Sequence, residues 1–164
     1  MKKVFIVGAG QMGLDIGQVF AKTGYQVVYN DMSEEILATQ VGKLEKSLDK
    51  MVSKGKMTEE KKAEIMGNVS TSVGLDAAAD ADLEAIVENV QVKKDLFAKL
   101  DALCKPETIL ATNTSSISIT EIASATKRQD KVIGMHFFNP ATVMKLVEVI
   151  NGLNTSKETF DTVY

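Results

Sequence analysis

The chain has 164 residues, of which 45% are hydrophobic and 25% charged, and this length and composition predict a single soluble globular domain. Its 19 lysine and arginine residues against 22 acidic residues give a formal net charge of -3, which excludes a global positive field that would hold nucleic acid or an anionic membrane. One cysteine, Cys104, and one histidine, His136, are too few for an intramolecular disulfide or a Cys/His zinc site, and the single cysteine fits a cytoplasmic location.

The first half of the chain alternates predicted strands with predicted helices. Val4–Val7 is an uninterrupted apolar run that ends at a glycine, which is typical of a strand buried on both faces of a parallel sheet. Ser33 is expected to cap a long helix that Gly55 ends, and Thr58 begins a second one, so that the two form a helical hairpin inserted between strands. In this half we expect strands over residues 4–7, 27–29 and 69–73, and helices over residues 12–22, 33–54 and 58–66.

The second half continues the same alternation. We expect strands over residues 83–87, 109–112, 132–135 and 143–150, and helices over residues 92–104 and 119–126. The alternation predicts an α/β fold of the Rossmann type, with a doubly wound, mostly parallel sheet, in one domain over residues 1–164. No run approaches the ~18 apolar residues that a membrane span needs. Residues 156–164 resemble the opening turns of a helix without a terminating signal, so we expect the chain to be a piece of a longer one.

Gly8, Gly10 and Gly13 form a GxGxxG motif directly after the first predicted strand and at the start of a helix. In the dinucleotide-binding fingerprint the first glycine permits a tight turn, the second lets the backbone approach a pyrophosphate, and the third lets the helix pack on the strand. The amino terminus of the helix then receives the negative charge. The motif predicts a dinucleotide site, the alternative being a glycine-rich turn without a ligand.

Asp31 lies 18 residues beyond Gly13, at the end of the second predicted strand. A carboxylate at that place binds the ribose hydroxyls of a dinucleotide and repels a 2′-phosphate. No lysine or arginine immediately follows Asp31, so the sequence favours NAD over NADP. The alternative is that Asp31 serves as a helix cap ahead of Ser33.

Polar residues gather at the carboxyl ends of the later strands, which is the edge of an open α/β sheet where ligands bind. They are Glu88, Lys93, Asn113, Thr114, Ser115, Ser116, His136 and Asn139. A single histidine beside two phenylalanines is, taken alone, more often structural than catalytic.

Three strings of the sequence resemble a known family. Asn113-Thr114-Ser115-Ser116, His136-Phe137-Phe138-Asn139-Pro140 and Met144-Lys145-Leu146-Val147-Glu148 are similar to the 3-hydroxyacyl-CoA dehydrogenases, and in particular to the bacterial 3-hydroxybutyryl-CoA dehydrogenases. The resemblance runs from Met1 to Tyr164, and its motifs together are specific, although the glycine motif alone is not. It implies an oxidoreductase that interconverts 3-hydroxybutyryl-CoA and acetoacetyl-CoA with NAD(H).

The resemblance also implies roles for individual residues. His136 would take the hydroxyl proton while hydride leaves the same carbon for the nicotinamide. Glu148 would hold the imidazole in one tautomer, and Ser115 would hydrogen-bond the substrate oxygen as charge develops there. The residues that would contact the cofactor are Gly8, Gly10, Gln11, Met12, Gly13, Asp31, Glu88, Lys93, Asn113, Ser115 and Asn139.

For CoA, the resemblance implies contacts from the long predicted helix. Ser47, Lys50 and Lys54 are spaced three and four residues apart, share one helix face, and would meet the CoA phosphates. Ser115 and Asn139 would also contact the substrate. The alternative for the helix face is an ordinary solvated lysine surface.

Two departures from the family limit these implications. The family carries a second, helical domain that forms the homodimer and closes over the substrate, and this chain stops before it, so we expect cofactor binding with impaired turnover. The predicted strand over residues 83–87 is two residues shorter than in relatives, which leaves open either a true deletion or an unrecorded gap in the sequence. Two rival functions also stay open: a non-catalytic dinucleotide-sensing module, and a dehydrogenase for a free hydroxy acid.

Overall fold

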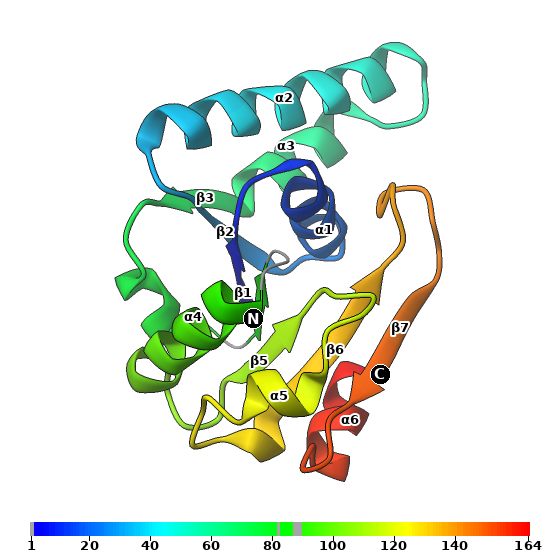
Figure 1. Cartoon of the computed structure of the whole chain (residues 1–164). Helices are drawn as coiled ribbons and strands as arrows, with labels where there is room; N and C mark the ends of the chain where they lie inside the picture. Colours follow the sequence, from blue (N-terminus) through cyan, green and yellow to red (C-terminus); the bar gives the residue numbers. More distant parts are fainter. Residues whose placement is uncertain (1, 82, 87–89) are drawn as a thin grey trace.

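A computed structural model describes residues 2–81, 83–86 and 90–164 and contains one seven-stranded sheet within them. The strand order is β3-β2-β1-β4-β5-β6-β7, and every neighbouring pair is parallel except β6 and β7, which are antiparallel. The strands are β1 (Lys3–Val7), β2 (Gln26–Asn30), β3 (Val69–Ser72), β4 (Leu83–Ile86), β5 (Ile109–Thr112), β6 (Val132–Phe137) and β7 (Val147–Asn151). This topology confirms the predicted Rossmann-type sheet (Figure 1).

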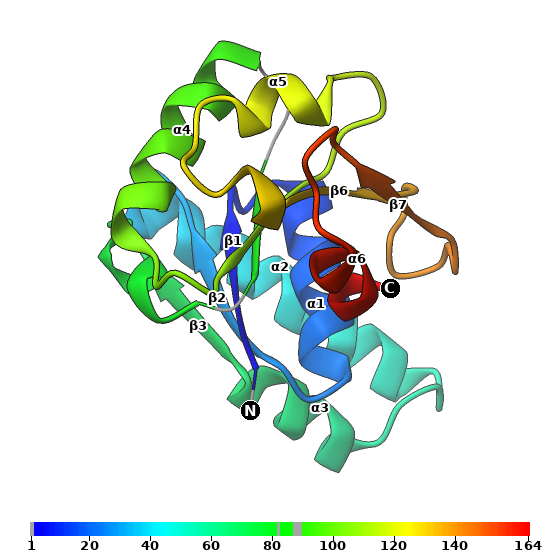
Figure 2. The same cartoon turned by 90° about the horizontal axis from the view of Figure 1, so that it is seen from below.

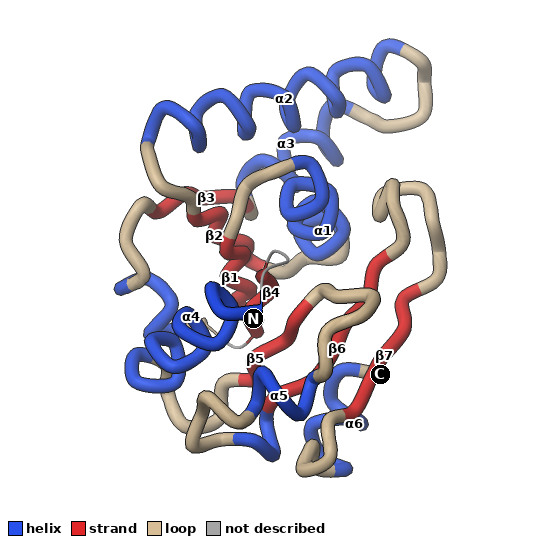
Figure 3. Tube along the Cα trace, viewed as in Figure 1, coloured by secondary structure: helices blue, strands red, loops and turns tan. Residues whose placement is uncertain are grey.

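Helices cover both faces of the sheet, as the doubly wound prediction requires. They are α1 (Gln11–Lys22), α2 (Glu34–Ser53), α3 (Glu59–Gly67), α4 (Val90–Leu103), α5 (Ile119–Ala123) and α6 (Lys157–Val163). Figure 2, seen from below, shows α1 and α6 on one side of the strands and α4 and α5 on the other. The helical hairpin of α2 and α3 follows β2 and precedes β3 in the sequence. In space it lies on the outer side of α1 (Figure 3).

Strand β1 is apolar from Val4 to Val7 because both of its faces are covered. Val4 and Ile6 pack with α1 and the hairpin, while Phe5, between them in the sequence, packs with α4 and α5. All three side chains are at most 1% exposed. Alternate residues of a strand point to opposite faces, so an uninterrupted apolar run is what a doubly covered strand needs.

Helix α1 approaches β2 closely at Gly17. A Cβ built on Gly17 would lie 2.3 Å from the hydroxyl oxygen of Tyr29 and 2.4 Å from its ring, so only glycine leaves room for this aromatic side chain. Tyr29 is fully buried, and its hydroxyl donates to the carbonyl of Leu14 at 2.8 Å. The contact fixes α1 against β2.

The predicted ends of the hairpin helices are confirmed by their caps. The Ser33 hydroxyl accepts a hydrogen bond from the backbone N–H of Ile36 at 3.2 Å, and the Thr58 hydroxyl accepts one from Lys61 at 3.1 Å. Between the helices Gly55 has a φ of +67°, a left-handed conformation that glycine adopts without strain. Each cap satisfies a backbone donor that the first turn of a helix leaves without a partner.

One predicted element is wrong in its bounds. The alternating pattern over residues 143–150 predicted a strand throughout, but residues 143–146 belong to the loop between β6 and β7, and β7 starts at Val147. Pro140 causes the difference, because its carbonyl accepts hydrogen bonds from the N–H groups of Val143 and Met144, at 3.0 and 2.9 Å, which fold this segment into a turn. Smaller differences are that α5 ends at Ala123 and that β6 continues to Phe137.

The only arginine of the sequence, Arg128, closes the end of α4. Its guanidinium donates to Asp101 Oδ1 at 2.6 Å and to the carbonyls of Asp101 and Lys105 at 2.8 and 2.6 Å. The Asp101 carbonyl is an acceptor of the last helical turn, and Lys105 lies just past the end of the helix. In the described part of the chain, no helix combines the length and the apolar character that crossing a membrane requires.

Candidate functional site

The glycine turn joins β1 to the first turn of α1 at the carboxyl edge of the sheet. Gly8 has a φ of +95°, and a Cβ on Gly13 would lie 1.9 Å from the Gly8 carbonyl oxygen, so the helix can start here only with glycine at position 13. A Cβ on Gly10 would meet nothing within 4 Å, which leaves open space in front of the turn. The turn thus presents backbone N–H groups at a helix amino terminus to a space that a phosphate could fill.

Asp31 lies against this turn. Its Oδ2 accepts the N–H of Ala9 at 2.8 Å, and its Oδ1 accepts the N–H of Met32 at 2.7 Å. The helix that follows is capped by Ser33, so the alternative role of Asp31 as a helix cap is wrong. Each carboxylate oxygen can accept a further hydrogen bond, and the side chain therefore stands beside the glycine turn as a ribose-binding carboxylate would.

His136 and Glu148 are brought together by the antiparallel pairing of β6 with β7. The two residues are direct partners in the ladder, and His136 Nδ1 lies 2.9 Å from Glu148 Oε2. The Phe138 ring packs beside the imidazole, with 4.6 Å between the ring centroids. Because a carboxylate only accepts hydrogen bonds, the contact keeps the proton on Nδ1 and leaves Nε2 of the neutral ring as a proton acceptor.

Ser115 lies at the tip of the loop that follows β5. The preceding residue shapes this loop, because the Thr114 hydroxyl accepts the N–H groups of Ser116 and Ile117 at 3.3 and 3.0 Å. Thr114 is buried, whereas Ser115 is exposed. The turn therefore presents the Ser115 side chain at the same sheet edge as the glycine turn.

Asn113 ties the loop after β5 to the end of β6. Its Oδ1 accepts the backbone N–H of Phe137 at 2.8 Å, directly beside His136 in the sequence. Asn139, in the loop that follows β6, is exposed. The bond holds the loop that carries Ser115 against the strand that carries the imidazole.

Lys93 is fully buried rather than open to a surface groove. Its Nζ donates to Thr112 Oγ1 at 2.9 Å and to the Asn113 carbonyl at 3.2 Å, so its ammonium supports the carboxyl end of β5. Glu88, the other residue expected on this side of the cofactor, lies outside the described residues.

Gln11 and Met12 open helix α1, and both have partners within the chain. Gln11 Nε2 donates to Asp15 Oδ1 at 2.9 Å, and Met12 packs against the core cluster of β1 and β2. Asp15 is 7% exposed, and this burial raises the pKa of its carboxyl although the hydrogen bond from Gln11 opposes the shift. Burial and the nearby Asp15 also raise the pKa of the Tyr29 phenol.

Ser47, Lys50 and Lys54 line a cleft of about 690 Å³ between α1, the end of α2, the α2–α3 turn and the β6–β7 loop. Its described lining contains no aspartate or glutamate. It does contain four further lysines that the sequence did not suggest: Lys22, Lys56, Lys61 and Lys145. Lys145 is 91 residues from Lys54 in the sequence, so local spacing gave no signal of their meeting. The predicted lysine face is therefore one wall of a basic cleft.

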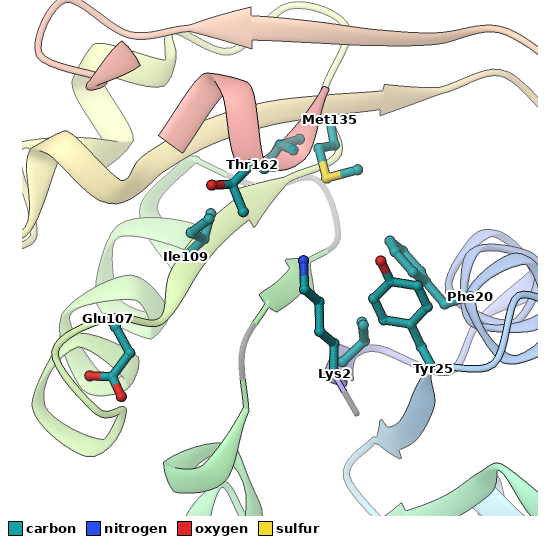
Figure 4. A pocket seen from close by; sticks show the side chains of 9 residues that line it. Lys2, Phe20, Tyr25, Glu107, Ile109, Met135 and Thr162 are labelled. Carbon is teal, nitrogen blue, oxygen red and sulfur yellow. The ribbon is translucent and has the colours of Figure 1, made fainter. Parts of the chain in front are cut away.

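A second cavity, of about 280 Å³, lies at the amino-terminal edge of the sheet, where β1 and β5 begin, and thus opposite the glycine turn. Figure 4 shows Lys2, Phe20 and Tyr25 on one side of it and Ile109, Met135 and Thr162 on the other. Ligands of open α/β sheets bind at the carboxyl ends of the strands, so this cavity is not a candidate for the dinucleotide. Among the described residues, no group of three His, Cys, Asp or Glu side chains could hold a metal ion.

Comparison with known proteins gives one family. Residues 3–164 match the family described as 3-hydroxyacyl-CoA dehydrogenase, NAD binding domain. The chain is 53% identical over 164 residues to the 3-hydroxybutyryl-CoA dehydrogenase of Clostridioides difficile, covering 99% of this chain and 58% of that protein. It is 47% identical over 174 residues to the human mitochondrial hydroxyacyl-coenzyme A dehydrogenase, covering 99% and 54%.

Solved structures of dehydrogenases of this kind also superpose closely on the chain. The 3-hydroxybutyryl-CoA dehydrogenase from Escherichia coli K12 superposes with a TM-score of 0.96 at 43% identity, over 99% of this chain and 35% of that one. The (S)-3-hydroxybutyryl-CoA dehydrogenase from Ralstonia eutropha gives a TM-score of 0.95 at 41% identity, over 99% and 58%. The chain spans a little more than half the length of the two curated relatives.

Proposed function

Since the chain belongs to the 3-hydroxyacyl-CoA dehydrogenase family and matches its NAD-binding domain, we propose that it serves the interconversion of 3-hydroxybutyryl-CoA and acetoacetyl-CoA by hydride transfer with NAD(H). The observation that carries the proposal is the 2.9 Å contact between His136 Nδ1 and Glu148 Oε2, at the sheet edge that also holds the glycine turn and Ser115. A proton acceptor, an oxyanion donor and a dinucleotide turn at one edge are what oxidation of a secondary alcohol requires.

The residues around the glycine turn fit NAD. Gly10 leaves open space for a pyrophosphate, and Asp31 stands beside the turn to accept ribose hydroxyls. The Asp31 carboxylate would repel a 2′-phosphate, which favours NAD over NADP. Bound NAD would supply or accept the hydride. We also propose that Asn113, Asn139 and Glu88 lie around the cofactor. Lys93 would act indirectly, through its hydrogen bonds to the carboxyl end of β5.

His136 is the proposed general base. Because Nδ1 is held by Glu148, Nε2 is the atom that would take the proton from the substrate hydroxyl, and in the reverse direction return it. Glu148 accepts a hydrogen bond from Nδ1–H throughout and stabilises the imidazolium that forms. The pair thus keeps one proton on Nδ1 and transfers another at Nε2.

Ser115 is the proposed hydrogen-bond donor to the substrate oxygen. Its loop is shaped by Thr114 and tied to β6 through Asn113, so its hydroxyl is positioned before the substrate arrives. A donor that is held in place stabilises developing negative charge without a cost of reorganisation at the moment of reaction.

We propose that a helical domain follows in the full-length protein, forms a homodimer and completes the substrate site, and that the protein acts in the cytoplasm. On this proposal the present chain alone binds NAD(H) with little turnover, while the full-length protein is active.

The test is reduction of acetoacetyl-CoA by the full-length protein, followed through NADH consumption, with NADPH and free acetoacetate as parallel reactions. We expect turnover with NADH and acetoacetyl-CoA, much less with NADPH, and a loss of about 100-fold or more in His136→Gln. Undiminished activity of His136→Gln would contradict the assigned base, and preference for free acetoacetate would assign another class of hydroxy-acid dehydrogenase. Binding of NADH without any turnover would favour a dinucleotide sensor.

A further inference from the structure

One hairpin carries both the proposed proton-transfer pair and a wall of the basic cleft. Strands β6 and β7 hold His136 and Glu148 as direct partners, and the connecting residues 138–146 run from one to the other. Lys145 lies in this connection, three residues before Glu148, and lines the cleft. Figure 1 shows the tip of the hairpin extending toward the α2–α3 turn.

The tip of this hairpin is held by little packing within the described chain. Val143, Met144 and Leu146 are 69%, 43% and 55% exposed, and Lys145 between them is also exposed. Two backbone hydrogen bonds to the Pro140 carbonyl shape the turn, at 3.0 and 2.9 Å. The side chains of the tip are therefore accessible to a ligand in the cleft.

The charge of the cleft specifies the kind of ligand. Lys22, Lys50, Lys54, Lys56 and Lys61 approach it from α1 and the hairpin of α2 and α3, and Lys145 approaches it from the β6–β7 loop. Only Lys61 among these six has an ion pair with a described acid, Glu64, at 2.9 Å. On a chain with a formal net charge of -3, this concentration of cations fits a ligand that carries several negative charges.

We propose that Lys145 binds a phosphate of the CoA nucleotide in this cleft and so fixes the hairpin that sets Glu148 against His136. The inference rests on the proposed acyl-CoA substrate and adds a positioning residue to it. The lysines of α2 would supply affinity, whereas Lys145, once it holds the phosphate, would fix the relative position of the imidazole and the carboxylate. Binding energy from a part of the substrate that does not react would thus be used at the reacting end.

The test uses the single histidine of the chain as its probe. Adenosine 3′,5′-bisphosphate has phosphates like those of CoA but no pantetheine arm, and is titrated into the chain saturated with NAD+, so that the glycine turn is already occupied. We expect the imidazole NMR signals of His136 to move as the bisphosphate binds. Affinity is measured in parallel by calorimetry.

Two substitutions separate affinity from positioning. Lys54→Gln should weaken binding about tenfold, by loss of one charge-assisted hydrogen bond, yet reach the same final His136 signal at saturation. In Lys145→Gln saturated with the bisphosphate, the His136 signal should stay where it lies in the absence of the bisphosphate. Lys99→Gln, an exposed residue of α4 on the opposite face of the sheet, is the matched control and should behave as the wild type.

Three results would overturn the inference: no binding of the bisphosphate, an unmoved His136 signal in the saturated wild type, or full movement in Lys145→Gln. None of them bears on whether the full-length protein reduces acetoacetyl-CoA. Conversely, a protein without turnover could still show the coupling, so the two proposals fail separately.

Discussion

His136 Nδ1 and Glu148 Oε2 lie 2.9 Å apart across the antiparallel pair of β6 and β7, in a register that makes the two residues direct partners. Side chains alternate along a strand, so a shift of β7 by one residue would turn Glu148 to the other face of the sheet. The contact consequently depends on the register of two strands at the edge of the sheet, and not only on the two side chains.

Replacing Glu148 by glutamine should lower kcat of the full-length protein about 100-fold or more while NADH affinity stays unchanged. The amide can hydrogen-bond Nδ1 but cannot stabilise an imidazolium by its charge. Steady-state rates of NADH consumption and a fluorescence titration of NADH measure the two effects. Glu60→Gln, an exposed change on α3, is the control. A wild-type kcat in Glu148→Gln would remove the carboxylate from the mechanism.

Gly13→Ala should abolish NADH binding by the chain and lower its free energy of unfolding by about 2 kcal/mol. The new Cβ would lie 1.9 Å from the Gly8 carbonyl oxygen, so the turn or the helix must move. Gly42→Ala, in the middle of α2 with nothing within 4 Å of its Cβ, should instead stabilise the chain by about 0.5–1 kcal/mol and leave NADH binding intact. NADH fluorescence and urea denaturation test both, and equal effects at the two positions would disprove the backbone argument.

Asp31→Ala should weaken NADH binding by the chain about tenfold and reduce its preference over NADPH. The substitution removes the carboxylate that stands beside the glycine turn and would accept ribose hydroxyls. Parallel fluorescence titrations with the two reduced cofactors measure the change. An unaltered ratio of the two dissociation constants would show that another residue selects the cofactor.

Asp15→Asn should raise the free energy of unfolding at neutral pH and reduce its dependence on pH. Burial raises the pKa of Asp15 above its ordinary 3.8, so the folded chain binds this proton more tightly than the unfolded chain does. The folded state therefore loses stability as the pH rises from 3.8 through the raised pKa, and the asparagine variant lacks this loss.

The matched control for Asp15 is Asp95→Asn. Asp95 accepts a hydrogen bond from Gln91 at 3.0 Å with the same spacing of four residues, but on an exposed face of α4. Urea denaturation of both variants across the acidic range is the measurement. If the two substitutions have the same effect, burial of Asp15 is not the cause.

The parts of the fold that sequence patterns predicted are those fixed by local interactions. The turn from β1 into α1 and the caps at Ser33 and Thr58 depend on residues within a few positions of one another. The alternation at Met144 and Lys145 resembles a strand and so predicts a start of β7 that is too early, whereas hydrogen bonds to the Pro140 carbonyl determine a turn there.

The parts of the site that the sequence did not predict depend on contacts between residues distant in sequence. The resemblance pointed to His136 and Glu148, but the meeting of Lys145 with the lysines of α2 follows from how the hairpin lies over the cleft. Likewise, nothing local to Lys93 indicates that its ammonium is buried against Thr112, 19 residues away. Long polar side chains can point outward or inward, and tertiary packing decides which.

The packing of Gly17 against Tyr29 differs in kind from that of Gly13 against Gly8, and the difference would appear in a genetic screen. At Gly17 the obstacle to a larger residue is a ring, so a Gly17→Ala strain could regain function through a second change such as Tyr29→Val. At Gly13 the obstacle is a main-chain carbonyl that every amino acid shares. Suppressors of Gly17→Ala should thus map to position 29, while Gly13→Ala should yield only true revertants.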